Sequence, residues 1–113
     1  MCGIVGFINN GSKQELQNAV SVIKHRGPDY QGVNWFSKHN SGLGHARLSI
    51  IDLSDDGHQP MYDKNTGNWI VFNGEVYNYQ EIRNELRKLG YDFYSNTDTE
   101  FDRNINNLKI SII

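Results

Sequence analysis

The chain opens with MCGIVGFI (residues 1–8), and the turn-forming residues Asn9-Asn10-Gly11 follow. The apolar run from residue 3 to residue 8 has the length and the β-branched content of a buried strand. Cys2, the single cysteine of the chain, therefore stands at the very start of the first strand. Because one cysteine cannot form an intramolecular disulfide, Cys2 is either a plain buried thiol or a reactive one.

Two helices and several short strands are predicted after this opening. A capping box at residues 12–15, followed by apolar residues at helical spacing, predicts a helix over about 13–25. Asn78 offers a cap for a second helix, which runs from residue 79 until Gly90 ends it. Strands are expected at 34–36, 43–51, 69–72 and, beginning with Tyr91-Asp92-Phe93, at 91–93. Strands interleaved with two helices favour an α+β layered fold over a parallel doubly wound one.

Composition argues against several classes of protein. The 113 residues leave room for one domain, and a net charge of −2 gives no electrostatic reason to expect a nucleic acid or an anionic membrane as partner. No stretch approaches the ~20 apolar residues of a membrane span, and the opening run lacks a basic n-region, so we expect a cytoplasmic protein. The four histidines show no metal-ligand spacing, and no metal is expected.

The position of Cys2 suggests one kind of chemistry. If the initiator Met1 is removed, Cys2 becomes the first residue and carries a free α-amino group. Such an amine has a pKa of about 7.7–8.0, so near neutral pH a useful fraction can take the thiol proton, directly or through water. One residue would then supply both the nucleophile and the base.

Four further segments follow the opening in a fixed order: HRGPD (25–29), GHARLSIIDL (44–53), FNGEVYNY (72–79) and SNTDTE (95–100). With these segments the chain resembles class II glutamine amidotransferases, which are N-terminal nucleophile hydrolases. The Arg-Gly-Pro-Asp and Arg-Leu-Ser-Ile-Ile-Asp-Leu segments, with Gln59-Pro60-Met61, are similar to the asparagine synthetase type. The resemblance covers residues 2–100, the N-terminal part of such a domain, and leaves 101–113 as a divergent Asn/Ile-rich tail.

The resemblance implies a layered αββα sandwich of the N-terminal nucleophile hydrolase kind, incomplete in this chain. It makes Cys2 the nucleophile that forms a thioester. The Asn73 side-chain amide and the Gly74 backbone N–H would stabilise the oxyanion, and both would contact the substrate. Arg26 and Asp29, in the Arg-Gly-Pro-Asp loop, would shape the site without doing chemistry.

The remaining site residues would bind the two charged ends of glutamine. The planar guanidinium of Arg47 would bind both oxygens of the carboxylate. The alternative interpretation is that Arg47 forms an ion pair on the protein surface. Glu75 and Asp98 would hold the ammonium group, although without the resemblance they read as solvated surface charges. The segment after Arg47 would line the substrate with backbone groups while its side chains join the core. These lining positions are Leu48, Ser49, Ile50 and Ile51.

The implied activity is hydrolysis of glutamine to glutamate and ammonia for asparagine biosynthesis. The expected partners are glutamine and a synthetase domain or subunit that receives the ammonia. ATP and Mg²⁺ would belong to that synthetase domain, whose Ser-Gly-Gly-x-Asp-Ser loop does not occur in these 113 residues. Three interpretations stay open: a glutaminase module that acts with a synthetase, an inactive truncated remnant, and a non-enzymatic glutamine-binding or interaction protein.

Overall fold

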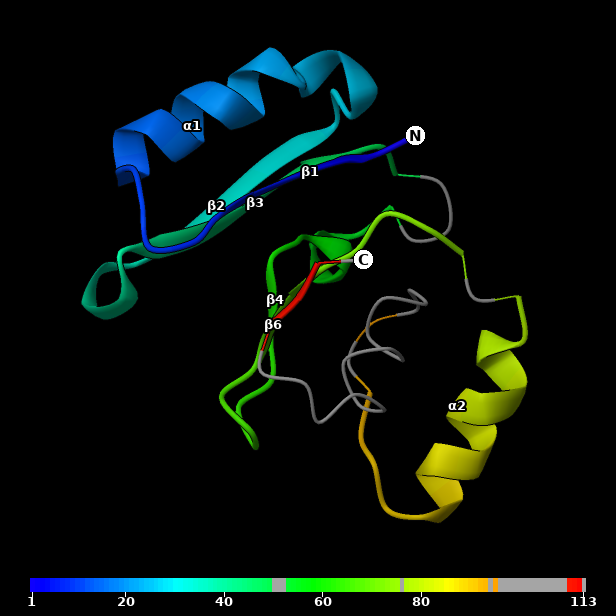
Figure 1. Ribbon diagram of the computed structural model, residues 1–113. Coiled ribbons are helices and arrows are strands. Elements are labelled where there is room, and N and C mark those ends of the chain that lie inside the picture. The colour runs from blue at the N-terminus through cyan, green and yellow to red at the C-terminus, as the bar shows by residue number, and fades with distance from the viewer. Residues whose placement is uncertain (50–52, 76, 94, 96–109, 113) are drawn as a thin grey trace.

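A computed structural model of the chain describes residues 1–49, 53–75, 77–93, 95 and 110–112. It shows a mixed α+β arrangement with two three-stranded sheets and two α-helices within the described residues (Figure 1). The predicted α+β class is therefore confirmed. The predictions that concern Ile50, Ile51, Asp98 and the tail up to residue 109 lie outside the described residues.

The first sheet is antiparallel and has the strand order β1-β3-β2. Its strands are β1 (Gly3–Phe7), β2 (Tyr30–Phe36) and β3 (Ser41–Arg47). Every residue of the central strand β3 is buried, because it has a strand on each side and a layer on each face.

The helix α1 (Lys13–Val22) covers one face of this sheet (Figure 1). Two glycines of β3 allow the close approach: a Cβ atom on Gly42 would lie 2.6 Å from the Leu16 side chain, and one on Gly44 would collide with Val20. Leu16 and Val20 are both almost fully buried, so the apolar stripe of α1 seals this face.

The second sheet lies against the opposite face of the first sheet (Figure 1). It consists of β4 (Met61–Tyr62), β5 (Trp69–Val71) and β6 (Ile110–Ile112), with β4 antiparallel and β6 parallel to β5. Phe36 at the end of β2 meets Trp69 of β5 edge to face, with ring centroids 5.7 Å apart. Near the other end of β2, Gly32 lies so close to the Gln59 backbone that no side chain would fit.

The boundaries of several elements differ from the prediction. The first helix ends at Val22, and a turn of 3₁₀ helix (Lys24–Arg26) replaces its predicted last turn, a common way for a helix to tighten before Gly-Pro. The strand predicted at 34–36 begins at Tyr30 and is longer than expected. The strand predicted at 43–51 begins at Ser41 and ends at Arg47, since the backbone of Leu48 and Ser49 turns to other partners.

The C-terminal half shows the largest differences. The predicted helix is present as α2 (Tyr79–Lys88), and Gly90 follows with φ 91° as expected of a helix end. No strand forms at 91–93; instead the guanidinium of Arg83 lies 5.0 Å from the centroid of the Phe93 ring, which turns the chain back onto α2. The strands β4 and β6 were not predicted, since two or three residues carry too little periodicity to be seen.

Candidate functional site

Cys2 lies directly before β1 and opposite the end of β3. The register of β1 with β3 ends at Gly3 opposite Ala46, and Cys2 and Arg47 are the residues that follow this last pair on the two strands. A Cβ atom on Gly3 would point at Ile23, on the α1 side. Arg47, next to Ala46 on an alternating strand, points to the other face of the sheet.

The Cys2 thiol is partly buried and held by the backbone of Leu48. The Leu48 N–H donates to Cys2 Sγ at 3.3 Å, and the thiol lies 3.6 Å from the Leu48 carbonyl oxygen. The segment after Arg47 thus contacts the Cys2 thiol with its backbone groups.

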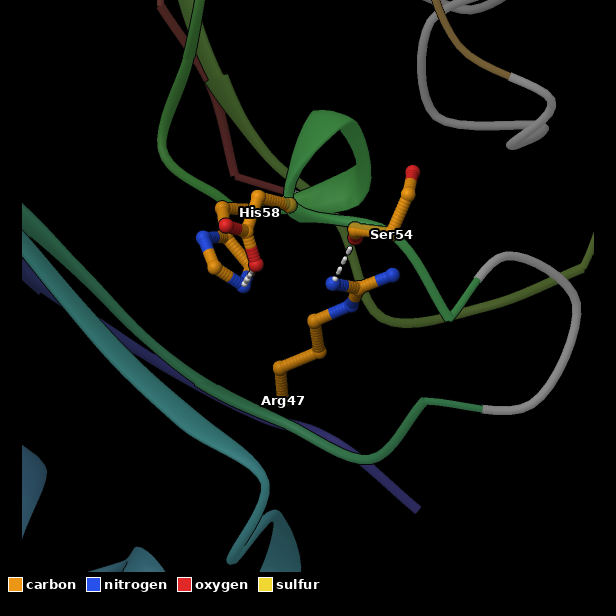
Figure 2. Close-up of polar contacts among 4 residues, drawn as sticks. Arg47, Ser54 and His58 are labelled. Atoms are coloured by element: carbon orange, nitrogen blue, oxygen red, sulfur yellow. Dashed lines mark hydrogen bonds and ion pairs between the residues drawn. The ribbon is translucent and has the colours of Figure 1, made fainter.

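Arg47 is 5% exposed and therefore does not lie on the surface of the described structure. Its Nη1 donates to the Ser54 carbonyl oxygen at 2.7 Å (Figure 2). The turn that carries this oxygen is itself anchored: His58 Nε2 lies 3.4 Å from an oxygen of Asp55, and the His58 ring stacks on Tyr30 of β2 at a centroid distance of 3.5 Å. The Arg47 guanidinium is therefore held by a loop that has contacts of its own with β2.

The segment His25-Arg26-Gly27-Pro28-Asp29 wraps around the ends of β1 and β3. Arg26 Nε donates to the Cys2 carbonyl oxygen at 3.2 Å. The Asp29 N–H donates to the Arg47 carbonyl at 3.0 Å, and the Asp29 carboxylate accepts the Ser49 N–H at 2.7 Å. A side chain at Gly27 would collide with the backbone of Ala46. These contacts join the loop to the backbone of Cys2, Arg47 and Ser49.

Asn73 and Gly74 directly follow the buried residue Phe72, beyond the end of β5. Asn73 is half-buried, whereas Gly74 and Glu75 are exposed. The Phe72 N–H donates to Gln59 Oε1 at 2.6 Å, which fixes the strand end that leads into Asn73. The start of β1, the end of β3 and the end of β5 thus each carry predicted site residues.

His45 lies on the same face of β3 as Arg47, two residues earlier, and its side chain is 0% exposed. Burial lowers the pKa of His45 from 6.5 to about 4; the Arg47 charge adds to this lowering, and the Phe72 backbone opposes it. The imidazole is therefore neutral at physiological pH. The sequence patterns did not single out His45, although its place two residues before Arg47 on an alternating strand puts both side chains on one face of the sheet.

The structure brings one group of the predicted site residues together, and other predicted site residues lie on a different strand end or outside the described residues. Cys2, Arg47, Leu48 and Ser49 form one cluster. Asn73, Gly74 and Glu75 follow β5, whereas Ile50, Ile51 and Asp98 are outside the described residues. Among the residues that are described, no group of three or more His, Cys, Asp or Glu side chains is placed to hold a metal ion. None of the described helices is long and apolar enough to span a bilayer.

The described residues form a mixed α+β domain with two sheets, in which a cysteine stands directly before the first strand and a buried arginine ends the central strand. The glutamine amidotransferase domain family matches residues 1–102, so the chain belongs to this family. Glutamine is the substrate that this family membership implies.

Several known proteins are similar to the chain over 88% of its length. "Amidase chry2" of Gibberella zeae is 44% identical, and the glutamine-hydrolysing asparagine synthetase 1 of Bacillus subtilis is 42% identical. A putative glutamine-hydrolysing asparagine synthetase 2 of Methanocaldococcus jannaschii is 40% identical. The aligned region covers 17%, 16% and 22% of these three proteins, respectively. The chain therefore corresponds to an N-terminal part of asparagine synthetases and related amidases.

Proposed function

We propose that the chain binds glutamine and hydrolyses its side-chain amide through Cys2, as the glutaminase part of an asparagine synthetase. The observation that carries the proposal is the contact of the Cys2 thiol with the backbone N–H of Leu48, the residue that directly follows the buried Arg47. A guanidinium beside a thiol matches a substrate that has a carboxylate at one end and a reactive carbonyl at the other.

The proposed reaction begins once Met1, which is 76% exposed, has been removed. The free α-amino group takes the thiol proton, and the thiolate attacks the amide carbon. Asn73 and Gly74 would stabilise the oxyanion; each donor of this type contributes about 10²–10³ in rate. As the intermediate collapses, the α-ammonium returns the proton to the leaving nitrogen, ammonia departs and a Cys2 thioester remains. Water then releases glutamate and restores the thiol.

The proposal includes the complete fold and the fate of the ammonia. The succession of α1, first sheet and second sheet supports three layers of an αββα sandwich, and α2 would supply the fourth. Arg47 would hold the substrate carboxylate, and Glu75 with Asp98 would hold its ammonium group. The ammonia would pass to a synthetase domain or subunit that binds ATP and Mg²⁺ and forms asparagine. The asparagine synthetases among the relatives support this destination.

The decisive experiment measures ammonia release from glutamine by protein with Met1 removed. We expect turnover, and we expect a glutamine analogue with an electrophilic side chain to add one equivalent at Cys2. Cys2→Ala and Cys2→Ser should abolish or cripple turnover, and protein that retains Met1 should be inactive because its amine is in a peptide bond. Labelling at another residue, or full activity of Cys2→Ala, would refute the assignment of the nucleophile.

A further inference from the structure

Gln59 has a polar side chain that is almost fully buried, with 7% of the residue exposed. Its Oε1 atom accepts the backbone N–H of Phe72 at 2.6 Å, and this contact is itself buried. Phe72 directly follows Val71, the last residue of β5. A buried backbone N–H beyond the end of a strand still needs an acceptor, because leaving it without one is costly. The Gln59 side chain supplies that acceptor.

The backbone of Gln59 lies against the first sheet. A Cβ atom on Gly32 of β2 would collide with the carbonyl group of Gln59, so the two backbones are in direct contact. A glycine inside a strand often marks such a close approach of another backbone. Gln59 therefore joins the two sheets: its main chain touches β2, and its side chain holds the residue that follows β5.

The Phe72 side chain extends this support to Gly74. Phe72 is 8% exposed and belongs to a buried cluster with Met61 and Ile70. A Cβ atom on Gly74 would lie 2.8 Å from the Cζ atom of the Phe72 ring, closer than a real Cβ atom approaches its neighbours, so the ring lies directly against the Gly74 backbone. Phe72 is thus fixed at its N–H by Gln59 and contacts Gly74 with its ring.

We propose that Gln59 is a positioning residue, which acts through Phe72 to hold Asn73 and Gly74 in the geometry that stabilises the oxyanion. The inference rests on the proposed function, because it concerns the oxyanion donors of that reaction. Such donors accelerate a reaction when they are aimed in advance at the place where negative charge develops, and the residues behind them must hold that aim. The neutral amide of Gln59 can accept the N–H without placing a charge between the sheets.

The test compares Gln59→Leu, which removes the acceptor at similar size, with Gln59→Glu, which keeps an oxygen at the same position. A misplacement of about 1 Å in a site can cost ~10²-fold in rate. We expect Gln59→Leu to lower kcat at least tenfold with little change in KM, because the oxyanion exists only in the intermediate and Arg47 still binds the ground state. Gln59→Glu should recover part of kcat. Ile70→Val is the matched control, since it removes volume from the same buried cluster and leaves the acceptor of the Phe72 N–H in place, and it should keep the wild-type kcat.

A second measurement does not depend on turnover, and so separates failure of this inference from failure of the proposed function. In ¹⁵N-labelled protein, the Phe72 amide proton should exchange with solvent faster in Gln59→Leu than in wild type. The amide resonances of Asn73 and Gly74 should shift more in Gln59→Leu than in Ile70→Val.

Two provisions keep the test decisive. If Gln59→Leu does not fold, Gln59→Asn, whose side chain is one bond shorter, replaces it in both measurements. If wild type releases no ammonia, the resonances and the exchange rate alone decide. Asn73 and Gly74 resonances that move no more than in Ile70→Val, or an unchanged kcat, would make Gln59 a packing residue and overturn the inference.

Discussion

The surroundings of Arg47 fix the orientation of a single charged side chain. It is buried, its Nη1 donates to Ser54, and the turn beyond Ser54 is pinned by the stack of His58 on Tyr30. Burying a guanidinium costs free energy unless hydrogen bonds and an opposite charge compensate it. In the proposed site the substrate carboxylate would contact this guanidinium, so the exact geometry of the Arg47 side chain matters for binding.

We therefore predict that Arg47→Lys weakens glutamine binding although it keeps the charge. A lysine offers a point charge in place of a planar fork, so hydrogen bonds worth about 1.5–3 kcal/mol would be lost, roughly a tenfold or larger rise in Kd. Isothermal titration calorimetry with Cys2→Ala protein measures binding without turnover. Arg87→Lys, at an exposed position of α2, is the control. Equal affinities for Arg47→Lys and the control would mean that the carboxylate binds elsewhere.

The lowered pKa of His45 predicts that the free energy of unfolding depends on pH. Its pKa in the folded protein, about 4, lies below the ordinary 6.5, so the unfolded chain takes up a proton in this range that the folded protein excludes. The stability contributed by the neutral ring is thus complete above pH 6.5 and is lost as the pH falls toward 4. The full effect is about 3 kcal/mol.

Urea denaturation at several pH values tests this prediction. Wild type should lose stability between pH 6.5 and pH 5 more steeply than His45→Phe, which cannot titrate at this position. His39→Phe should keep the wild-type slope, since His39 is exposed. Parallel curves for wild type and His45→Phe would show that His45 titrates normally.

At the scale of elements, the two helices begin in different ways. The Ser12 hydroxyl accepts the Glu15 N–H at 3.2 Å and so caps α1 as the sequence indicates. Asn78 occupies the corresponding position of α2, but its side chain makes no capping hydrogen bond. The expected side-chain cap by Asn78 is therefore absent, because its backbone, with ψ 23°, does not adopt the extended conformation of a typical N-cap.

This contrast makes a prediction for a matched pair of variants. Ser12→Ala should lower the free energy of unfolding by about 1 kcal/mol, because an N–H of the first turn loses its acceptor. Asn78→Ala should change it by less than about 0.5 kcal/mol, as for an ordinary exposed position. Chemical denaturation measures both values. A loss on Asn78→Ala as large as that on Ser12→Ala would mean that the α2 cap forms in solution.

The packing of α2 also departs from its sequence pattern. Tyr79, Ile82, Leu86 and Leu89 recur at the spacing of a buried stripe, yet Leu89 is 74% exposed. Within the described residues, the buried side chain of this helix is Arg83, whose guanidinium lies over the rings of Tyr79 and Phe93. Long side chains can bury their stems on aromatic surfaces while the charged head stays solvated or stacked.

At the scale of the whole molecule, binding and folding are linked. A ligand that binds the folded state alone stabilises it by RT ln(1 + [L]/Kd), about 2.7 kcal/mol at a hundredfold excess over Kd. The proposed ligands of glutamine come from three strand ends, β1, β3 and β5, so binding requires the two sheets to stay packed. Glutamine should therefore stabilise the whole fold and raise the midpoint of the global unfolding transition.

We predict that saturating glutamine raises the Tm of Cys2→Ala protein by roughly 10 °C, from the stabilisation above and the usual Tm shift for a domain of this size. Differential scanning fluorimetry provides the measurement, with glutamate and asparagine as comparison ligands. Arg47→Ala in the same background should remove most of the shift. A shift without ammonia release by the unmutated protein would favour a glutamine-binding protein over an enzyme, and no shift would favour an inactive remnant.

The sequence by itself determined the α+β class, the two helices, the place of Cys2 at the first strand and the family, because these depend on local periodicity, caps and ordered motifs. Tertiary structure alone decided the rest. It placed the Cys2 thiol against the backbone N–H of Leu48, buried Arg47 against Ser54, and set the Gln59 side chain on the backbone N–H of Phe72. The short strands β4 and β6 also could not be predicted from the sequence. Pairing between residues more than forty positions apart depends on which faces pack together, and local sequence patterns carry no record of the partner.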